Sequence, residues 1–278
     1  MMAGKSIPRR ERALGVFFSS LILATLALAA GGSQPAPLSF EVKGVKFRML
    51  PVPAGSFTMG SPPSELSRGR SEVLHPVSFS RAFYLAEHEM TQDLFQAITG
   101  TNAAMIKGPR LPVELVSWEE AMECCRKLTR LTGTAFTLPT ESQWEYACRA
   151  GTSTPFSFGH DLDSKNANFD GEAPYGLGAA GPSRGQVIPV GSFRTNAWGF
   201  YDMHGNVWEW CLDWYGKYPY QAVTDPQGPE AGVLRVYRGG SWLGSGANCR
   251  SAVRNSSEPQ DKILGVGFRL ACPAPTAN

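Results

Sequence analysis

The sequence predicts an α+β domain with short helices and strands and long irregular loops. Its composition is rich in Gly and Pro, which interrupt regular structure, and in aromatic residues, with 30 Gly, 21 Pro, 7 Trp, 8 Tyr and 15 Phe among 278 residues. Three short segments carry helix-capping residues, whereas another alternates apolar and polar residues as a strand does. A hydrophobic fraction of 42% with 18% charged residues is enough to bury a core, so disorder is excluded.

The first thirty residues have the pattern of a secretory signal peptide. Four basic residues precede the uncharged run 13–30, which ends in the small-x-small step Ala27-Leu28-Ala29. We expect cleavage after Ala29, and therefore an exported protein, periplasmic or extracellular, without a stable membrane span. The alternative is a retained anchor, because a run of 18 residues is close to the length of a bilayer span.

Charge and cysteine content limit the possible partners. Removing residues 1–29 takes away four basic residues and one acidic residue, which changes the net charge from +2 to −1. There is no basic excess, so a nucleic-acid partner is not expected. All six Cys follow residue 30, and an even number in an exported chain indicates disulfides. Residues 30–38 resemble a linker before a domain at 39–273, and 274–278 form a tail.

The domain is expected to begin with strands. Segment 39–60 alternates apolar and polar residues, and we predict two short strands with a turn at Pro53-Ala54-Gly55. The polar segment 61–75 is predicted to be a loop.

Three helices follow. One starts after Thr91 and ends at Gly100, and the other two start at the capping boxes Ser117–Glu120 and Thr140–Gln143. Beyond residue 150 the helical period disappears over about 120 residues. So much irregular backbone is unusual in a compact domain unless disulfides or metal ions hold it.

Seven short motifs, in one order along the chain, carry a family resemblance. They are GSFTMG at 55–60, EMTQ at 89–92, PVELVSW at 112–118, LPTESQWEYA at 138–147, GFYDMHGNVWEW at 199–210, RGGSW at 238–242 and GFR at 267–269. Residues 40–272 thereby resemble the sulfatase-modifying-factor domain, the family of the formylglycine-generating enzymes. The resemblance implies that family's variant of the C-type lectin fold, with a small antiparallel sheet, helices and much irregular structure.

The resemblance also implies a calcium site within the 199–210 motif. Its ligands would be Asp202 and Glu209, together with the carbonyls of Gly205 and Val207. Calcium accepts carboxylate and carbonyl oxygens together, and Asp202, at a position where relatives carry Asn, keeps an oxygen ligand. The alternative is that Glu209, amid aromatic neighbours, pairs with an Arg or with backbone amides, because a buried carboxylate needs a partner.

A second calcium site of the family begins with an Asn and an apolar residue, a pattern that Asn168 and Phe169 match. Its further Asp ligand has no clear counterpart in the Gly- and Ala-rich stretch 176–185. Calcium is therefore the expected cofactor, through one or both sites.

Copper is not expected. Formylglycine-generating enzymes hold Cu(I) between two thiolates in a C-x-x-x-x-C motif after the Gly-Gly-Ser, and soft thiolates suit that ion. Here the first thiolate position is Gly244. Counted from Gly240, Cys249 matches the second thiolate; counted back from Arg254, it matches a disulfide cysteine. Cys249 and Ser241 are thus the remaining candidates for a catalytic role.

The family's structural pairings would imply disulfides Cys148–Cys249 and Cys125–Cys272. Under that interpretation Cys249 is structural, and no pair of copper ligands exists under either count.

Two functions follow. The first is a non-catalytic ligand-binding or display scaffold for an unknown ligand, protein or glycan, because residues 238–270 resemble the C-terminal region of proteins varied by diversity-generating retroelements. The alternative is a divergent oxidase that acts on a protein cysteine. An accessory module of an exported assembly is a third possibility. The simplest interpretation of residues 238–270 is an ordinary polar loop without a partner. The candidate ligand surface comprises Trp242, Leu243, Ser245, Ala247, Asn248, Arg250, Ser256 and Glu258.

Overall fold

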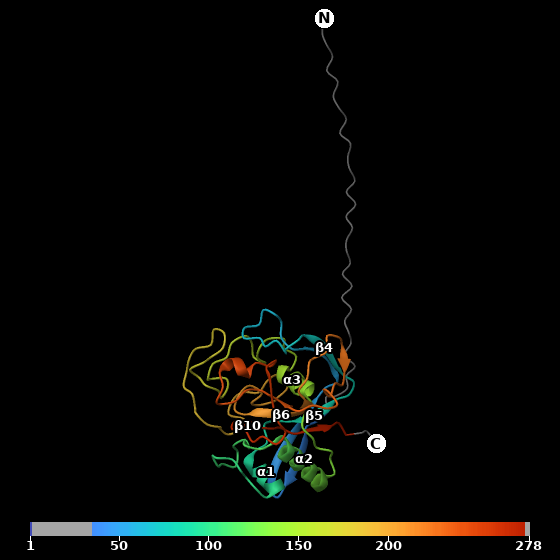
Figure 1. The fold of residues 1–278 in the computed structure, drawn as a ribbon, viewed down its shortest axis with the longest axis vertical. Coiled ribbons are helices and arrows are strands. Elements are labelled where there is room, and N and C mark those ends of the chain that lie inside the picture. The colour runs from blue at the N-terminus through green and yellow to red at the C-terminus, as the bar shows by residue number, and fades with distance from the viewer. Residues whose placement is uncertain (2–34, 276–278) are drawn as a thin grey trace. The chain divides into compact units, whose positions relative to one another are not determined.

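The computed structural model describes Met1 and residues 35–275, so the predicted signal peptide lies outside the described residues (Figure 1). No helix of the described part is long and apolar enough to span a membrane. The helices are α1 (Gln92–Thr99), α2 (Trp118–Thr132), α3 (Glu141–Arg149) and the 3₁₀ turn η1 (Gly246–Cys249). The strands are β1 (Leu38–Val42), β2 (Val45–Val52), β3 (Gly55–Met59), β4 (His75–Phe79), β5 (Phe83–Ala86), β6 (Trp208–Trp214), β7 (Val223–Thr224), β8 (Arg235–Arg238), β9 (Arg254–Ser257), β10 (Val266–Gly267) and β11 (Ala271–Pro273).

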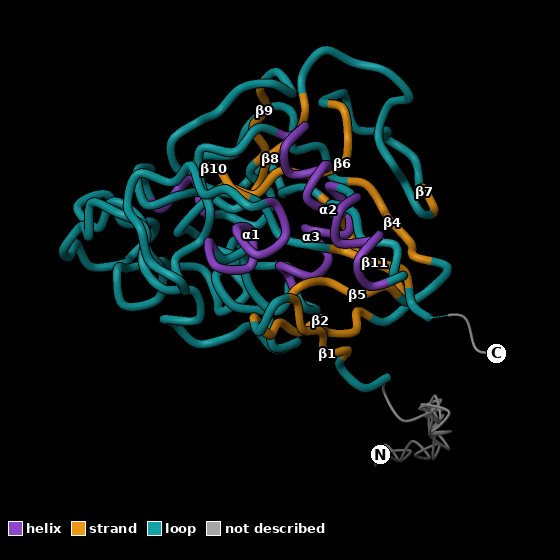
Figure 2. Tube along the Cα trace, turned by 90° about the horizontal axis from the view of Figure 1, so that it is seen from below, coloured by secondary structure: helices purple, strands orange, loops and turns teal. Residues whose placement is uncertain are grey.

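The described strands form three small sheets, ordered β1-β2-β5-β11, β10-β6-β8-β9 and β3-β4-β7. All pairings are antiparallel except the short edge pairs β10–β6 and β4–β7. Figure 2 shows how much of the remaining chain is loop. The α+β class with little regular structure is therefore confirmed.

The N-terminal region has one strand more than predicted. The turn between β2 and β3 falls at Pro53 and Ala54 as expected, but a further tight turn at Lys43 and Gly44 divides the first strand into the antiparallel pair β1–β2. Both turn residues have positive φ, 48° and 85°. Glycine adopts that conformation readily. Lysine rarely does, so the sequence at Lys43 does not indicate a turn, and the turn was missed.

The predicted helix starts are confirmed. In α2 the Ser117 hydroxyl accepts the Glu120 N–H at 3.2 Å, and the Glu120 carboxylate accepts the Ser117 N–H at 3.1 Å. Thr140 and Gln143 form the same box at α3. At α1, Thr91 occupies the cap position, but its hydroxyl donates to the Asp93 carboxylate and not to the helix backbone.

A buried ion network fixes α3 against the second sheet. Arg238 of β8 donates to the carboxylates of Glu141 and Glu145, and Arg149 donates to Glu145 at 2.8 Å. Arg254 of β9 reaches Glu141 at 2.6 Å. These side chains are almost fully buried, so each charge depends on its partners for the solvation that water would otherwise give.

The apolar core lies in two large clusters and a small one. The first joins α1 and α2 to strands β1, β2 and β5, and the second lies between α3, β6 and the sheet of β3 and β4. The third consists of residues from the irregular region with Cys249, namely Phe156, Leu162, Ala167, Phe169 and Tyr175. Trp208 and Trp210 are buried, whereas Trp214 is half-buried.

Asp213 joins the end of β6 to the start of α3. Its Oδ2 accepts the N–H of Glu141 at 2.8 Å. Burial, followed by the negative charge of Glu141, raises the pKa of Asp213 to about 7. Its carboxylate form therefore costs free energy in the folded protein.

We expect the unfolding free energy to fall as the pH rises from about 4 to about 8. Below pH 3.8, the ordinary pKa of Asp213, the group is protonated in both the folded and the unfolded protein. The loss of unfolding free energy is complete only above about pH 7, the pKa of Asp213 in the folded protein. At about 1.4 kcal/mol per pKa unit, this group accounts for up to roughly 4 kcal/mol. Asp213→Asn keeps an oxygen for the Glu141 N–H, so it should lack this part of the pH dependence. Denaturant melts across the pH range measure both proteins, and identical pH profiles would contradict the assignment.

Candidate functional site

Strand β6 carries Glu209 into the interior, where it meets Arg269. The guanidinium donates to both carboxylate oxygens, at 2.5 and 2.6 Å, and the indole N–H of Trp144 donates to Oε2 at 2.7 Å. All three side chains are fully buried. The alternative raised from the sequence, that Glu209 pairs with an Arg, is what the structure contains.

Two more carboxylates lie beside this pair. Asp202 accepts the Gly191 N–H at 2.6 Å through Oδ2, while its buried Oδ1 has no partner among the described residues. Glu89, immediately before α1, accepts from the Asn206 side-chain amide at 3.0 Å and the Val207 N–H at 3.2 Å.

The charges in this cluster do not balance. Burial raises the pKa of Asp202 to about 6. Burial, followed by the charges of Asp202 and Glu209, raises the pKa of Glu89 well above its usual value. Three carboxylates lie beside the guanidinium of Arg269, and Arg110 has a smaller lowering effect on the pKa of Asp202, so the cluster stays negatively charged unless a carboxyl group is protonated or a cation binds.

The second predicted calcium site lies next to the first. Asn168 donates to the Gln186 carbonyl at 2.9 Å and to the Asn206 Oδ1 at 3.0 Å, and its own Oδ1 is buried without a partner. The backbone of Asn168 lies so close to Gly205 that a Cβ there would be 2.4 Å from the Asn168 carbonyl oxygen. Phe169 is fully buried in the small core cluster.

Carbonyl and amide oxygens would have to supply much of any metal coordination here. In the described residues no three Asp, Glu, His or Cys side chains converge as a metal site. The two orphaned oxygens, Asn168 Oδ1 and Asp202 Oδ1, each belong to one of the two predicted sites. The residues therefore fit an oxygen-seeking cation, although Glu209 is already committed to Arg269.

The loop after the Gly-Gly-Ser buries both catalytic candidates. Cys249 is fully buried and Ser241 is 2% exposed. Burial raises the pKa of the Cys249 thiol far above its usual value, so the group is a thiol and not a thiolate. Gly240, at φ 81°, permits this packing, because a Cβ there would lie 2.6 Å from the Cys249 sulfur.

All six cysteines are buried free thiols, so the disulfides implied by the resemblance are not formed in this structure. The Cys148 sulfur lies 3.6 Å from the Ser251 hydroxyl and 3.7 Å from His204 Nε2. His204 in turn bonds to the Cys249 carbonyl at 2.8 Å. The first implied pair, Cys148 and Cys249, thus shares one neighbour, while Cys125 and Cys272 lie in the first core cluster.

The predicted ligand surface is only partly a surface. Leu243 is 49% exposed and Glu258 is exposed, while the other candidates, Trp242, Ser245, Ala247, Asn248 and Ser256, are half-buried. Arg250 is 1% exposed, and its guanidinium donates to Glu65 and Glu72. The prediction that Arg250 contacts a ligand is therefore wrong, because the side chain is an internal cation between two glutamates.

Sequence reasoning missed two members of the carboxylate cluster. Glu89 and Arg269 both lie in quoted motifs, EMTQ and GFR, but nothing in the sequence places them beside Glu209. The signal that could have found them is one acidic residue in the first motif and one basic residue in the second, since buried charges need partners.

Comparison with known families supports the same assignment. The model of the sulfatase-modifying factor enzyme 1-like domain matches residues 39–274. The chain belongs to this family.

Three relatives within or near this family are informative. Mouse formylglycine-generating enzyme is 27% identical, over 99% of this chain and 87% of its own. Among solved structures, Treponema denticola variable protein 1 (26% identity, TM-score 0.76) and PvdO from Pseudomonas aeruginosa (31% identity, TM-score 0.73) each cover 86% of this chain and 100% of their own. The fold is therefore that of the formylglycine-generating-enzyme family, as the motifs predicted.

Arg269→Met should lower the unfolding free energy by about 3–5 kcal/mol, because it leaves Glu209 as a buried charge without its cation. Adding Glu209→Gln to this variant should restore part of the loss. As a control, Arg48→Ala removes the exposed pair with Glu87 at 3.1 Å, which should cost less than about 1 kcal/mol. Denaturant titration measures the unfolding free energy of the unchanged protein and of the three variants. Equal losses of unfolding free energy in Arg269→Met and Arg48→Ala would contradict the role given to Arg269.

Proposed function

We propose that this family member is a non-catalytic ligand-binding or display scaffold, held by structural calcium, in an exported protein. The loop at residues 239–250 carries the proposal. Where the family's copper-binding enzymes place two thiolates, this chain has a glycine and a buried thiol. The same fold is retained around a site that lacks the metal ligands.

The vacated ligand position is filled by the loop itself. A Cβ at Gly244 would lie 3.0 Å from the Asn248 Oδ1. That oxygen accepts the Ser245 N–H and hydroxyl, both at 3.1 Å, and so closes the 3₁₀ turn η1. Cys249 is the last residue of this turn, and its sulfur lies 3.8 Å from the Ser245 carbonyl oxygen. A side chain added at Gly244 would therefore displace the Asn248 side chain that closes the turn.

The loop is well suited to present side chains. Its backbone is anchored from below by Arg250, His204 and the capped turn, while Leu243 protrudes into solvent. A rigid scaffold with exposed loop positions tolerates substitution at those positions. The similarity to Treponema denticola variable protein 1 supports a display function, and we propose a protein or glycan ligand for this face.

The fit of calcium rests on the two orphaned oxygens. Asp202 Oδ1 and the carbonyls of Gly205 and Val207 would hold one ion, and Asn168 Oδ1 with the Phe169 carbonyl would contribute to a second. Such an ion would neutralise the excess negative charge of the carboxylate cluster and would tie the irregular region to β6.

Calcium is expected to raise the melting temperature of the metal-free protein by about 5 °C at saturating concentration. Asp202→Ala should abolish most of the effect, whereas Asp202→Asn keeps an oxygen ligand and should retain it. Calorimetric melts with calcium and with chelator measure this. Equal responses of the two variants would contradict a role of Asp202 as a ligand.

The alternative, an oxidase acting on a protein cysteine, is favoured by the similarity to mouse formylglycine-generating enzyme along nearly the whole chain. We expect no copper-dependent oxygen consumption with a cysteine-containing sulfatase peptide, and no aldehyde product, because the chain lacks paired thiolates. An oxygen electrode measures the oxygen consumption, and mass spectrometry of the peptide detects the aldehyde. Formation of the aldehyde at one bound cuprous ion per chain would overturn the scaffold proposal.

Export and the implied disulfides are tested together. If the mature protein passes through an oxidising compartment, the pairs Cys148–Cys249 and Cys125–Cys272 should form, and Cys124 and Cys211 should be left. We expect two reactive thiols in the denatured protein recovered from that compartment. Six reactive thiols would contradict both pairings.

A further inference from the structure

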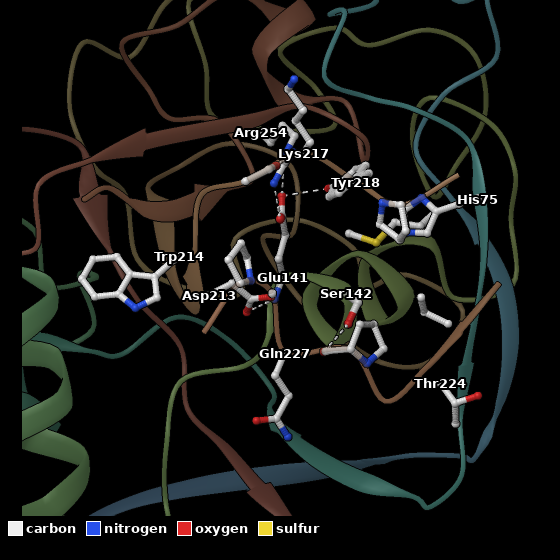
Figure 3. A pocket seen from close by; sticks show the side chains of 17 residues that line it. His75, Glu141, Ser142, Asp213, Trp214, Lys217, Tyr218, Thr224, Gln227 and Arg254 are labelled. Carbon is white, nitrogen blue, oxygen red and sulfur yellow. Dashed lines mark hydrogen bonds and ion pairs between the residues drawn. The ribbon is translucent and has the colours of Figure 1, made fainter. Parts of the chain in front are cut away.

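A second candidate site lies away from the loop and the carboxylate cluster. A pocket of about 510 Å³ opens between the end of β6, the segment 214–219, β7 and the segment 226–229 (Figure 3). This volume is within the range of small-molecule sites. None of the residues predicted to bind calcium or a displayed ligand lines it.

One side of the pocket is formed by side chains that pair with one another. Glu141 accepts hydrogen bonds from the Tyr218 hydroxyl at 2.8 Å and from Arg254 at 2.6 and 2.8 Å. The Arg254 guanidinium lies 3.8 Å over the Tyr218 ring. These contacts fix the Tyr218 ring as a wall of the pocket, and with the Gly216 carbonyl they use three of the five Arg254 N–H donors.

Two further buried side chains, His75 beside Tyr218 and Asp213 beside Glu141, each have an atom without a hydrogen-bond partner among the described residues. His75 is 3% exposed, and its Nδ1–H donates to the Val73 carbonyl at 3.0 Å, which leaves Nε2 with a lone pair. Asp213 is 4% exposed and bonds to the Glu141 N–H through Oδ2, whereas its Oδ1 has no hydrogen-bond partner among the described residues. Both side chains line the pocket (Figure 3). A ligand hydroxyl fits both groups, because it can donate to His75 Nε2 and can either donate to the Asp213 carboxylate or accept from the protonated acid at Oδ1.

The charge of the lining argues against a cationic ligand. Lys217 and Arg254 supply two positive charges, and Glu141 is already paired. Burial and then the charge of Glu141 raise the pKa of Asp213 to about 7, so a cation, which pairs only with the carboxylate form, loses this partner as the pH falls, whereas a hydroxyl pairs with either form. A neutral group with O–H donors suits both side chains, and its own oxygens suit the exposed Lys217 at the rim.

Ring-bearing residues also line the pocket, namely Trp214, Tyr218, Pro219, Pro226 and Pro229. A pyranose combines hydroxyls that both donate and accept with an apolar C–H face, which matches a lining of polar atoms and rings.

We propose that this pocket binds a neutral sugar unit, free or as part of a glycan, with hydroxyls donating to His75 Nε2 and Asp213 Oδ1. The site is independent of the loop and the calcium sites of the proposed function. Failure of either leaves the other standing.

Titration calorimetry of the purified mature protein against neutral monosaccharides and their trisaccharides tests the proposal, with glucosamine and methylguanidine as cationic probes. We expect a neutral sugar to bind with a dissociation constant below roughly 10 mM. Binding of monosaccharides indicates a free or terminal sugar, and binding of trisaccharides alone indicates the interior of a glycan; both support the proposal. Binding of the cations alone, or of no sugar in that range, overturns it.

Two variant pairs locate the binding. His75→Asn keeps an N–H for the Val73 carbonyl but lacks the outer acceptor, whereas His75→Gln keeps an acceptor near the Nε2 position. We expect affinity to fall roughly tenfold in the first and less in the second. Thr224→Trp at the exposed rim should block the pocket, and Leu131→Trp, on an α2 position that is 58% exposed, is its control. Thermal melts confirm folding, and unchanged affinity in both His75→Asn and Thr224→Trp overturns the assignment.

Discussion

Buried arginines, each paired with glutamates, are the constraint on which this fold depends. Arg238, Arg250 and Arg269 are at most 1% exposed, and each joins segments that are far apart in the sequence. Arg250 reaches Glu65 and Glu72, and Arg269 reaches Glu209. A chain with so few backbone ladders has few other ways to hold its loops, so charge pairing performs the role that regular secondary structure performs elsewhere. Because a buried charge without its partner is costly, the pairing also selects one arrangement of the loops.

This constraint explains how the loop at 239–250 keeps its shape without a bound metal. Gly244 has no side-chain ligand and Cys249 is a buried thiol, yet Arg238 before the loop and Arg250 within it are anchored. The proposed loss of the copper ligands would therefore leave the scaffold intact. Function can change at such a loop while the packing beneath it stays the same.

Local features were predictable from the sequence, and long-range pairings were not. The capping boxes at Ser117 and Thr140 depend on residues three positions apart, and both formed as expected. The turn at Lys43 was missed because a lysine with positive φ leaves no mark in the sequence. Arg250 was misassigned to the surface because its partners, Glu65 and Glu72, lie in a polar segment that gives no sign of folding inward. The family resemblance supplied the fold and the candidate calcium residues, but the pairing of Glu209 with Arg269 required the structure.

One residue, Arg254, lines the pocket and follows the loop at 239–250 in the chain. Arg254 opens β9 directly after the loop segment, and its guanidinium holds Glu141, which in turn holds Tyr218 in the pocket wall. Substitutions at exposed loop positions such as Leu243 leave this chain of contacts intact, whereas a change at Arg254 would disturb the pocket and the buried network together. Arg254 therefore separates the loop at 239–250 from the two later candidate ligand positions, Ser256 and Glu258, because its own side chain serves the interior and the pocket wall. In the proposed scaffold, substitutions in the loop would leave the pocket unchanged, since no residue of the loop lines it.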